Sequence, residues 1–275
     1  MVKKHIKWPF YYTAKVKRTP GFLIKQVFLE EFWIVLLAFG IFVLPLSITV
    51  FLSLIFLFAA MLSVYEIGYA QNDRVGQRKE AQPKLSQTFA ELGEFVIAPY
   101  AWLWAILFTV IGVFLLGDSA QMSALERLGL AQLGTGLAGD GAMIAIWLGL
   151  VAISQIMFAI FNHVPLFWRV YAYVPLHVSK YFAPAVFFAT GLVGMLFLAA
   201  HIVRTWSLYA IRRAGGDMDF VASQLIRLVF IVLMLALISA VQPAIEIWTA
   251  WQTWLILLFC VLRAVPELLR KRRAR

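Results

Sequence analysis

The sequence predicts an all-α membrane protein, a polytopic bundle of about eight transmembrane helices. Hydrophobic residues make up 63% of the 275 residues and charged residues only 14%, and the mean hydropathy is +0.85. Several separate apolar stretches reach the roughly 20 residues that a helix needs to cross a bilayer. Soluble domains of this length are not so apolar, so the composition excludes a soluble enzyme or binding module.

The expected spans follow one another with short polar, glycine- or proline-containing connections. In chain order they are residues 32–47, 49–70, 95–116, 141–161, 164–181, 183–201, 220–241 and 245–263. The first is short and contains Pro45, which favours a hairpin with the second. The fifth contains Arg169, His177 and Lys180, so an interfacial helix is the alternative for this stretch.

The positions of the tryptophans agree with the predicted ends of these spans, because tryptophan is enriched where a helix meets the headgroup region. The tryptophans at span ends are Trp33, Trp102, Trp104, Trp168, Trp248, Trp251 and Trp254.

Lysine and arginine residues predict the orientation, because short cytoplasmic loops are enriched in them. With eight spans, three basic segments share one side with the basic tail; these segments are 3–25, 74–84, 204–213 and the tail 270–275. The loop 117–140 lies on the other side and contains three acidic residues against one arginine. Seven spans would move Arg204, Arg212 and Arg213 outside. Eight spans with both termini cytoplasmic are therefore expected, in a bacterial inner (plasma) membrane.

Three regions follow from this topology. Residues 1–31 form a basic amphipathic cytoplasmic segment, residues 32–263 the transmembrane bundle, and residues 264–275 a basic cytoplasmic tail. The net charge of +10 would suggest nucleic acid in a soluble protein, but here it fits cytoplasmic loops beside anionic lipid headgroups. The expected partner is therefore the bilayer and not a nucleic acid. The single cysteine, Cys260, excludes an intrachain disulfide.

The end of the second span is the strongest candidate site. Glu66 lies within its last turns, and an ionisable side chain inside a spanning helix is costly enough to indicate a function. Glu66, Asp73 and Glu80 are spaced by seven residues, so on a continuous helix they share a face at intervals of roughly 10 Å. One ion does not bridge that distance. Two ions with a polyphosphate, or a helix broken at Gly76, are the alternatives.

This chemistry suits a phosphorylated substrate. Mg²⁺ is commonly held by one or two carboxylates and substrate phosphates. Basic side chains near Asp73 would add direct phosphate contacts, and these are Arg74, Arg78, Lys79 and Lys84. An ordinary positive-inside loop accounts for the bases but not for Glu66 within the span.

A second acidic site precedes the seventh span. The segment reads Gly215-Gly216-Asp217-Met218-Asp219. In the expected topology it faces the same side as Asp73. Asp217 and Asp219 either cap the following helix, where carboxylates favour the N-terminus, or hold a metal–phosphate opposite Asp73.

The residues Tyr69-Ala70-Gln71-Asn72-Asp73, followed by Glu80 and Pro83, resemble the first signature of the UbiA-type intramembrane prenyltransferases. That signature ends the second helix of the family, and a second acidic motif lies between helices six and seven. The sequence departs from the family at Gly76, which stands in place of the middle aspartate, and at Glu80, which replaces the last. The second motif and the number of spans also differ.

The resemblance implies an active site at the cytoplasmic face with Mg²⁺ as cofactor. Asp73 and Glu66 are then the expected catalytic residues. The expected metal ligands are Asn72, Asp73, Glu80, Asp217 and Asp219. The expected substrate-binding residues are Tyr69, Arg74, Arg78, Lys79, Lys84, Arg212 and Arg213. The basic, proline-containing stretch after Lys79 slightly resembles the branch that transfers phosphoribose to a polyprenyl phosphate.

Two classes of function stay open from the sequence. The first is a transferase acting on an isoprenoid or polyprenyl-phosphate lipid with a phosphorylated donor. The second is a non-catalytic transporter or lipid-binding protein with a degenerate site of UbiA type. Carboxylates that converge at one membrane face favour the enzyme, whereas charges distributed through several spans favour transport.

Overall fold

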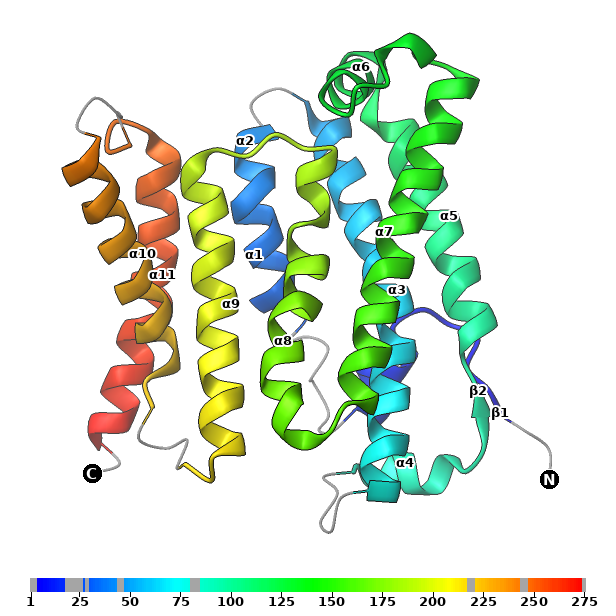
Figure 1. The fold of residues 1–275 in the computed structure, drawn as a ribbon, viewed down its shortest axis with the longest axis vertical. Helices are drawn as coiled ribbons and strands as arrows, with labels where there is room; N and C mark the ends of the chain where they lie inside the picture. The colour runs from blue at the N-terminus through cyan, green and yellow to red at the C-terminus, as the bar shows by residue number, and fades with distance from the viewer. Residues whose placement is uncertain are drawn as a thin grey trace. The chain divides into compact units, whose positions relative to one another are not determined.

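A computed structural model of the chain consists almost entirely of helices (Figure 1). It describes residues 4–17, 27, 30–43, 47–79, 85–216, 221–242 and 247–273. The chain divides into two compact units. Unit 1 comprises Met1–Trp33 and Leu46–Phe188, and unit 2 comprises Ile34–Pro45 and Ala189–Arg275.

Six helices among the described residues are long and apolar enough to cross a membrane, which confirms the predicted multi-pass membrane protein. They are α3 (Ile48–Lys79), α5 (Ala98–Leu116), α7 (Leu137–His163), α9 (Leu192–Arg213), α10 (Ser223–Val241) and α11 (Trp251–Arg273). The first three belong to unit 1 and the last three to unit 2.

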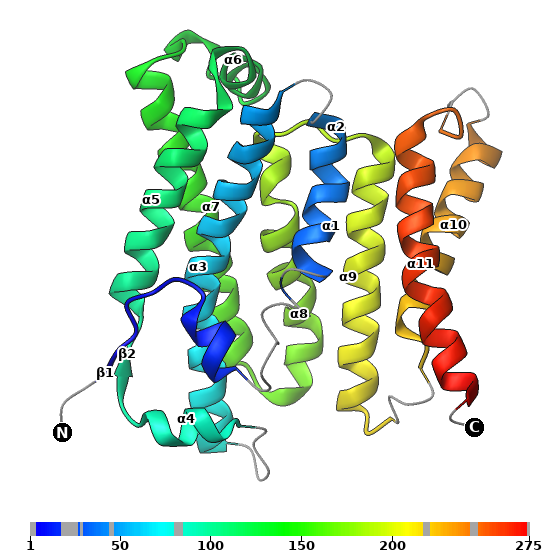
Figure 2. The ribbon, with the colours of Figure 1, turned by 180° about the vertical axis from the view of Figure 1, so that it is seen from behind.

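The first and fifth expected spans are shorter and less regular than predicted. The first is divided among α1 (Trp33–Val35), the π-helical segment η3 (Leu36–Gly40) and α2 (Ile41–Val43). The fifth is α8 (Leu166–Tyr181), which contains a proline and two buried cations and is followed by the 3₁₀ turn η5 (Ala183–Val186). Figures 1 and 2 show α8 running alongside α7, not across the helix ends as an interfacial helix would.

The helix α3 is longer than the predicted second span. Its 32 residues extend about 48 Å, against a hydrocarbon core of about 30 Å. Residues 71–79, expected as the start of a loop, instead continue the helix. Arg78 and Lys79 lie in its last turn, where cations complement the helix dipole. Glu66 and Asp73 therefore lie on one unbroken helix.

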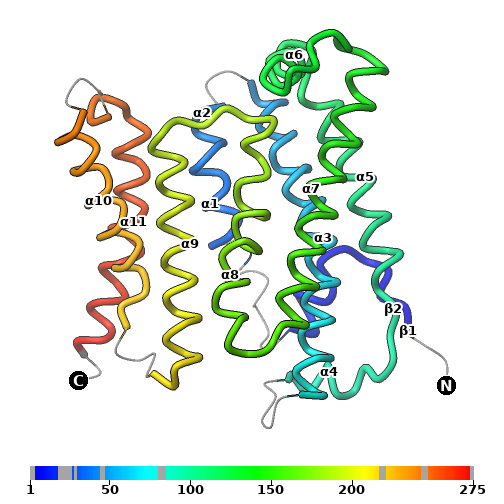
Figure 3. Tube along the Cα trace, in the orientation of Figure 1, coloured from blue at the N-terminus to red at the C-terminus, as the bar shows by residue number. Residues whose placement is uncertain are grey.

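The cytoplasmic segment expected at the N-terminus is folded into unit 1 where it is described. Residues 4–17, here named the N-terminal strap, contain β1 (Lys4–His5) and the π-helical segment η1 (Tyr12–Val16). β1 pairs in parallel with β2 (Phe95–Val96), which departs from a purely helical fold. The strap lies beside α3 and α5, as the dark blue trace in Figure 3 shows.

The connections of unit 1 lie at its two ends. α4 (Gln87–Leu92) and the strand pair lie at one end, and α6 (Asp118–Arg127) lies at the other, followed by η4 (Ala131–Leu133) (Figures 1 and 2). The two loops that the charge pattern assigns to opposite sides of the membrane are thus at opposite ends of this unit.

Close contacts hold α3 at the centre of unit 1, between α5 and α7. A Cβ added at Gly68 of α3 would overlap the ring of Phe158 on α7. A Cβ added at Gly112 of α5 would lie 2.7 Å from Leu57 of α3. Small residues of this kind let membrane helices approach closely, because packing and not water exclusion drives their association.

Unit 2 packs α9 against α10 and α11, with η3 against α9. The Arg227 side chain of α10 is fully buried, and its guanidinium donates to Gln224 and lies 5.6 Å from the ring centroid of Phe197 and 5.0 Å from that of Phe259. The carboxylate of Glu267 on α11 accepts the N–H of Gln224 at 2.6 Å, so it satisfies a backbone donor in the first turn of α10.

Candidate functional site

Two carboxylates of α3 are bound by the N-terminal strap. Glu66 Oε1 accepts the backbone N–H of Thr13 at 2.7 Å. About two helical turns further along α3 lies Asp73. Its Oδ2 accepts a hydrogen bond from the hydroxyl of Tyr12 at 2.8 Å, and its Oδ1 accepts one from Lys17 Nζ at 2.5 Å. The heptad spacing predicts that the two carboxylates share a face, and both of them meet the same short segment of chain.

The conformation of the strap explains how these donors reach α3. Phe10 has a φ of 60°, a left-handed backbone that is rare for an aromatic residue. Its ring stacks on Phe108 of α5, with planes only 6° apart, and so holds the turn in place. The π-helical segment that follows buries Tyr12 and Val16 against the unit. Unusual backbone conformations of this kind are often found at functional sites, because the surrounding packing must compensate their cost.

The pair formed by Asp73 and Lys17 is buried. The side chain of Asp73 is 10% exposed and that of Lys17 is 5% exposed. Burial and the adjacent Asp73 carboxylate raise the pKa of the Tyr12 phenol far above its usual value. The hydroxyl therefore stays protonated and donates a hydrogen bond to Asp73. Lys17 Nζ also lies 5.2 Å from the ring centroid of Tyr69, the distance of a cation–π contact.

A second buried ion pair of unit 1 involves α8. Lys180 Nζ of α8 is 2.5 Å from Glu31 Oε2. The ammonium lies 4.2 Å from the ring centroid of Tyr65 and 5.1 Å from that of Tyr181. The rings of Tyr65 and Tyr69 meet edge to face at 5.3 Å, so aromatic contacts connect the two ion pairs.

These groups form one assembly, here named the buried polar cluster. Its members are Tyr12, Lys17, Glu31, Tyr65, Glu66, Tyr69, Asp73 and Lys180. Buried charges in a membrane helix bundle are expensive and pair with one another, and they commonly mark functional pathways. The cluster is therefore the candidate functional site.

Two hydrogen bonds connect α3, α7 and the start of α8. Asn162 of α7 donates its side-chain N–H to the carbonyl of Gly68 at 3.1 Å, and Arg169 of α8 donates to the carbonyl of Asn162 at 2.9 Å. Arg169, which made the fifth span doubtful in the sequence, is thus a buried support of the α7–α8 turn.

The structure brings three of the predicted site residues together. Glu66, Tyr69 and Asp73 belong to the cluster. Arg74 donates to the carbonyl of Phe95 at 2.8 Å and lies over its ring, so it holds β2 against α3. Asn72 is half-buried, whereas Arg78 and Lys79 are exposed in the last turn of α3.

The remaining predicted residues lie in unit 2 or outside the described residues. Arg212 and Arg213 are exposed at the end of α9 in unit 2, where Arg213 contacts Tyr209. Glu80, Lys84, Asp217 and Asp219 lie outside the described residues. The helix α10 begins at Ser223 with Ala222 at the N-cap, so neither aspartate occupies the capping position considered for them.

The described residues do not fit a Mg²⁺ ion at Asp73. Both oxygens of this carboxylate are engaged, one by an ammonium and one by a hydroxyl. Within the described ranges, no three His, Cys, Asp or Glu side chains form a group that could hold a metal. At this position the protein supplies its own cation, Lys17.

Sequence reasoning missed five members of the cluster, which are Tyr12, Lys17, Glu31, Tyr65 and Lys180. Lys17 belongs to a basic N-terminal segment whose charges are also explained by the positive-inside rule, and Glu31 lies at the edge of an expected span. Only Lys180 gave a signal, as a cation within an apolar stretch.

No protein-family model, curated protein or solved structure matches the chain. The resemblance to the UbiA-type prenyltransferases therefore stays a hypothesis that depends on the residues around Asp73.

Proposed function

We propose that this membrane protein is a transferase that acts on an isoprenoid or polyprenyl-phosphate lipid with a phosphorylated donor. The observation that carries the proposal is the buried Asp73–Lys17 pair beside Tyr69, at the end of α3 that also exposes Arg78 and Lys79. The signature-like sequence Tyr69–Asp73 thus coincides with a cation, an aromatic ring and a basic rim.

The chemistry of such a transfer makes a cation the essential element. Negative charge develops on the departing phosphate, and a preorganised cation stabilises this charge in the transition state. Lys17 is the buried ammonium available for that role, held in position by Asp73. Arg78 and Lys79 would attract the anionic donor. Glu66 acts as a positioning residue, because it binds the backbone of the strap that carries Lys17.

Mg²⁺ enters this proposal only as a counter-ion carried in on the phosphates of the donor. No step is assigned to an ion at Asp73, because Lys17 and Tyr12 occupy its oxygens.

The proposed topology has eight crossings, with α1–η3–α2 and α8–η5 completing the six long helices. The α4 end of unit 1 faces the cytoplasm in this proposal. Labelling of Thr88→Cys and Ser119→Cys by an impermeant thiol reagent tests it, since both positions are exposed and Cys260 is buried. In intact cells we expect labelling at position 119 only. Labelling at position 88 would show that the orientation is the reverse of the proposed one.

The transfer assay uses purified protein with prenyl diphosphates or, separately, polyprenyl phosphate and phosphoribosyl diphosphate, each with Mg²⁺ or EDTA. Lys17→Met is the decisive variant and Lys15→Met its matched control, because Lys15 is exposed on the same strap. We expect Lys17→Met to lose at least ~100-fold in turnover, the scale of one key electrostatic group, while Lys15→Met keeps full activity. Equal activity of the two variants would show that the active site lies elsewhere.

The Glu31–Lys180 pair favours a second candidate, a non-catalytic transporter or lipid-binding protein. This pair extends the charged groups of unit 1 from the end of α3 to α8, and distributed buried charges are typical of transport pathways. Lipid transport between leaflets of proteoliposomes, in the absence of any transfer product, would support this function instead.

A further inference from the structure

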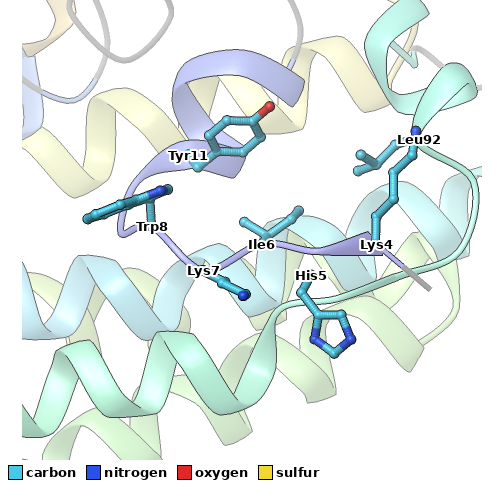
Figure 4. Close-up of a pocket in the computed structure, with 7 residues that line it drawn as sticks. All are labelled: Lys4, His5, Ile6, Lys7, Trp8, Tyr11 and Leu92. Atoms are coloured by element: carbon cyan, nitrogen blue, oxygen red, sulfur yellow. The ribbon is translucent and has the colours of Figure 1, made fainter. Parts of the chain in front are cut away.

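The N-terminal strap contacts α4 near both ends of that short helix. Near the start of the strap, Lys4 Nζ is 3.3 Å from the carbonyl of Glu91 in the last turn of α4. A pocket of about 410 Å³ follows, which residues 4–8 and Tyr11 of the strap line together with Leu92 (Figure 4). The other contact lies at the end of the strap, directly before Lys17.

This second contact is a hydrogen bond from a side chain to the strap backbone. The hydroxyl of Ser86 donates to the carbonyl of Val16 at 2.5 Å. Val16 is the last residue of η1, and the carbonyls at the end of a helical segment lack an intrahelical donor. Because this carbonyl belongs to the peptide bond between Val16 and Lys17, Ser86 holds the backbone from which the Lys17 side chain extends.

The fold of α4 keeps Ser86 in place. Ser86 is the N-cap of this helix, and its side-chain oxygen accepts the backbone N–H of Phe89 at 3.0 Å. A serine hydroxyl accepts and donates at the same time, so one side chain caps α4 and holds the strap. The ring of Phe95 lies 6.3 Å from that of Phe89 and 5.7 Å from that of Tyr12. The hydrogen bond is therefore supported by packing among α4, β2 and η1.

Lys17 is thus positioned from two sides. From α3, Asp73 accepts its ammonium and Glu66 accepts the N–H of Thr13, four residues earlier on the strap. From α4, Ser86 holds the carbonyl that precedes it. A displacement of about 1 Å is enough to weaken the stabilisation that a charged group gives to a transition state. Support from both sides therefore bears on the role proposed for this cation.

We propose that Ser86 is a positioning residue for Lys17, which connects the N-terminus of α4 to the buried Lys17–Asp73 pair. The effect of Ser86 on turnover rests on the proposed transferase function, whereas its effect on the strap does not. Loss of the hydroxyl removes one hydrogen bond. The population in which Lys17 separates from Asp73 should then rise about fivefold, the equilibrium equivalent of one ordinary hydrogen bond.

The test compares Ser86→Gly with Ala90→Gly in the full chain in detergent. Glycine caps a helix almost as well as serine, but it has no hydroxyl to donate. Ala90 is an exposed residue of α4, and glycine at this position weakens the helix at least as much while it leaves Ser86 unchanged. Ser86→Thr is the conservative variant, because threonine restores both the acceptor and the donor.

The first measurement is the rate at which an amine-reactive reagent acetylates Lys17. Lys15 is an exposed lysine of the same strap, so it serves as the internal reference in mass spectrometry of a peptide that contains both. We expect Lys17 to react about fivefold faster in Ser86→Gly, and at the wild-type rate in Ala90→Gly and Ser86→Thr. Equal rates in the two glycine variants would overturn the proposal and leave Ser86 as a helix cap alone.

Turnover is the second measurement. Ser86→Gly should lower kcat at an unchanged KM for the donor, because Lys17 acts in the transition state, and Ser86→Thr should recover it. Faster acetylation of Lys17 with an unchanged kcat would overturn the positioning role. A wild-type protein that transfers neither donor would instead contradict the proposed function, and the acetylation rates would still decide whether Ser86 holds Lys17.

Discussion

Two buried ion pairs among the described residues of unit 1 have the same chemistry but different supports. Lys17 reaches Asp73 from a short strap whose turn is held by Phe10 in a left-handed conformation. Lys180 reaches Glu31 from a helix, and the rings of Tyr65 and Tyr181 enclose its ammonium. A cation carried on a strap is held by the few contacts of that strap, whereas one enclosed by rings within the bundle is held by the packing of the helices. If the protein is a transferase, we expect the first pair to affect turnover and the second pair to affect stability.

The largest expected effect follows from breaking the Glu31–Lys180 pair, here called the enclosed pair. Lys180→Met leaves the Glu31 carboxylate buried without its cation, so the free energy of unfolding should fall by about 3–5 kcal/mol. Denaturant titration of the detergent-solubilised protein measures it, with Lys15→Met as the control. The double variant Lys180→Met/Glu31→Gln should recover most of the loss, because it removes both charges together. A stable single variant would contradict a structural role for this pair.

The next effect concerns the Lys17–Asp73 pair, here called the strap-supported pair. It is expected as a decrease in the turnover rate. Asp73→Asn keeps an oxygen acceptor for Tyr12 but removes the charge that positions Lys17, so transfer should slow by at least ~100-fold. The protein should remain folded, as judged by size-exclusion chromatography in detergent. If Glu31→Gln lowered turnover as much as Asp73→Asn while the fold persisted, the division of roles between the pairs would fail.

A smaller effect tests whether Lys17 takes the place of a metal ion. Lys17→Met leaves a buried carboxylate that a divalent cation can neutralise, so Mg²⁺ should stabilise this variant but not the wild type. At a Mg²⁺ concentration ten times its Kd the gain is about 1.4 kcal/mol, measurable as a higher melting temperature.

Lys17→Met/Asp73→Asn is the matched control for that experiment, because it has neither the cation nor the charge. Stabilisation of the wild type by Mg²⁺ that disappears in Asp73→Asn would show instead that a metal displaces Lys17 at this carboxylate.

A further effect on stability comes from removing one hydrogen bond of the strap-supported pair. Tyr12→Phe deletes the donor to Asp73 and keeps the ring, so the unfolding free energy should fall by about 1.5–3 kcal/mol, the scale of a hydrogen bond to a charged group. Tyr11→Phe is the control on the neighbouring exposed position. A neutral Tyr12→Phe would mean that Lys17 alone holds Asp73.

Composition and spacing determined the parts of this protein that depend on local sequence. The apolar stretches predicted a multi-pass helical membrane protein, because a helix that crosses hydrocarbon must be apolar over its whole length. The seven-residue interval predicted that Glu66 and Asp73 share a face, because helical geometry repeats on that scale. The end of α3 escaped prediction, since its polar turns after Ala70 resemble a loop in composition while still forming a helix.

The partners of those carboxylates were decided only by tertiary structure. Lys17 and Asp73 are 56 residues apart and Glu31 and Lys180 are 149 apart, and no periodicity relates residues across such intervals. The turn at Phe10 brings the strap to α3, and it depends on stacking against Phe108 of another helix. A charge in a basic N-terminal segment therefore becomes a buried counter-ion because the turn at Phe10 places Lys17 beside the Asp73 carboxylate of α3.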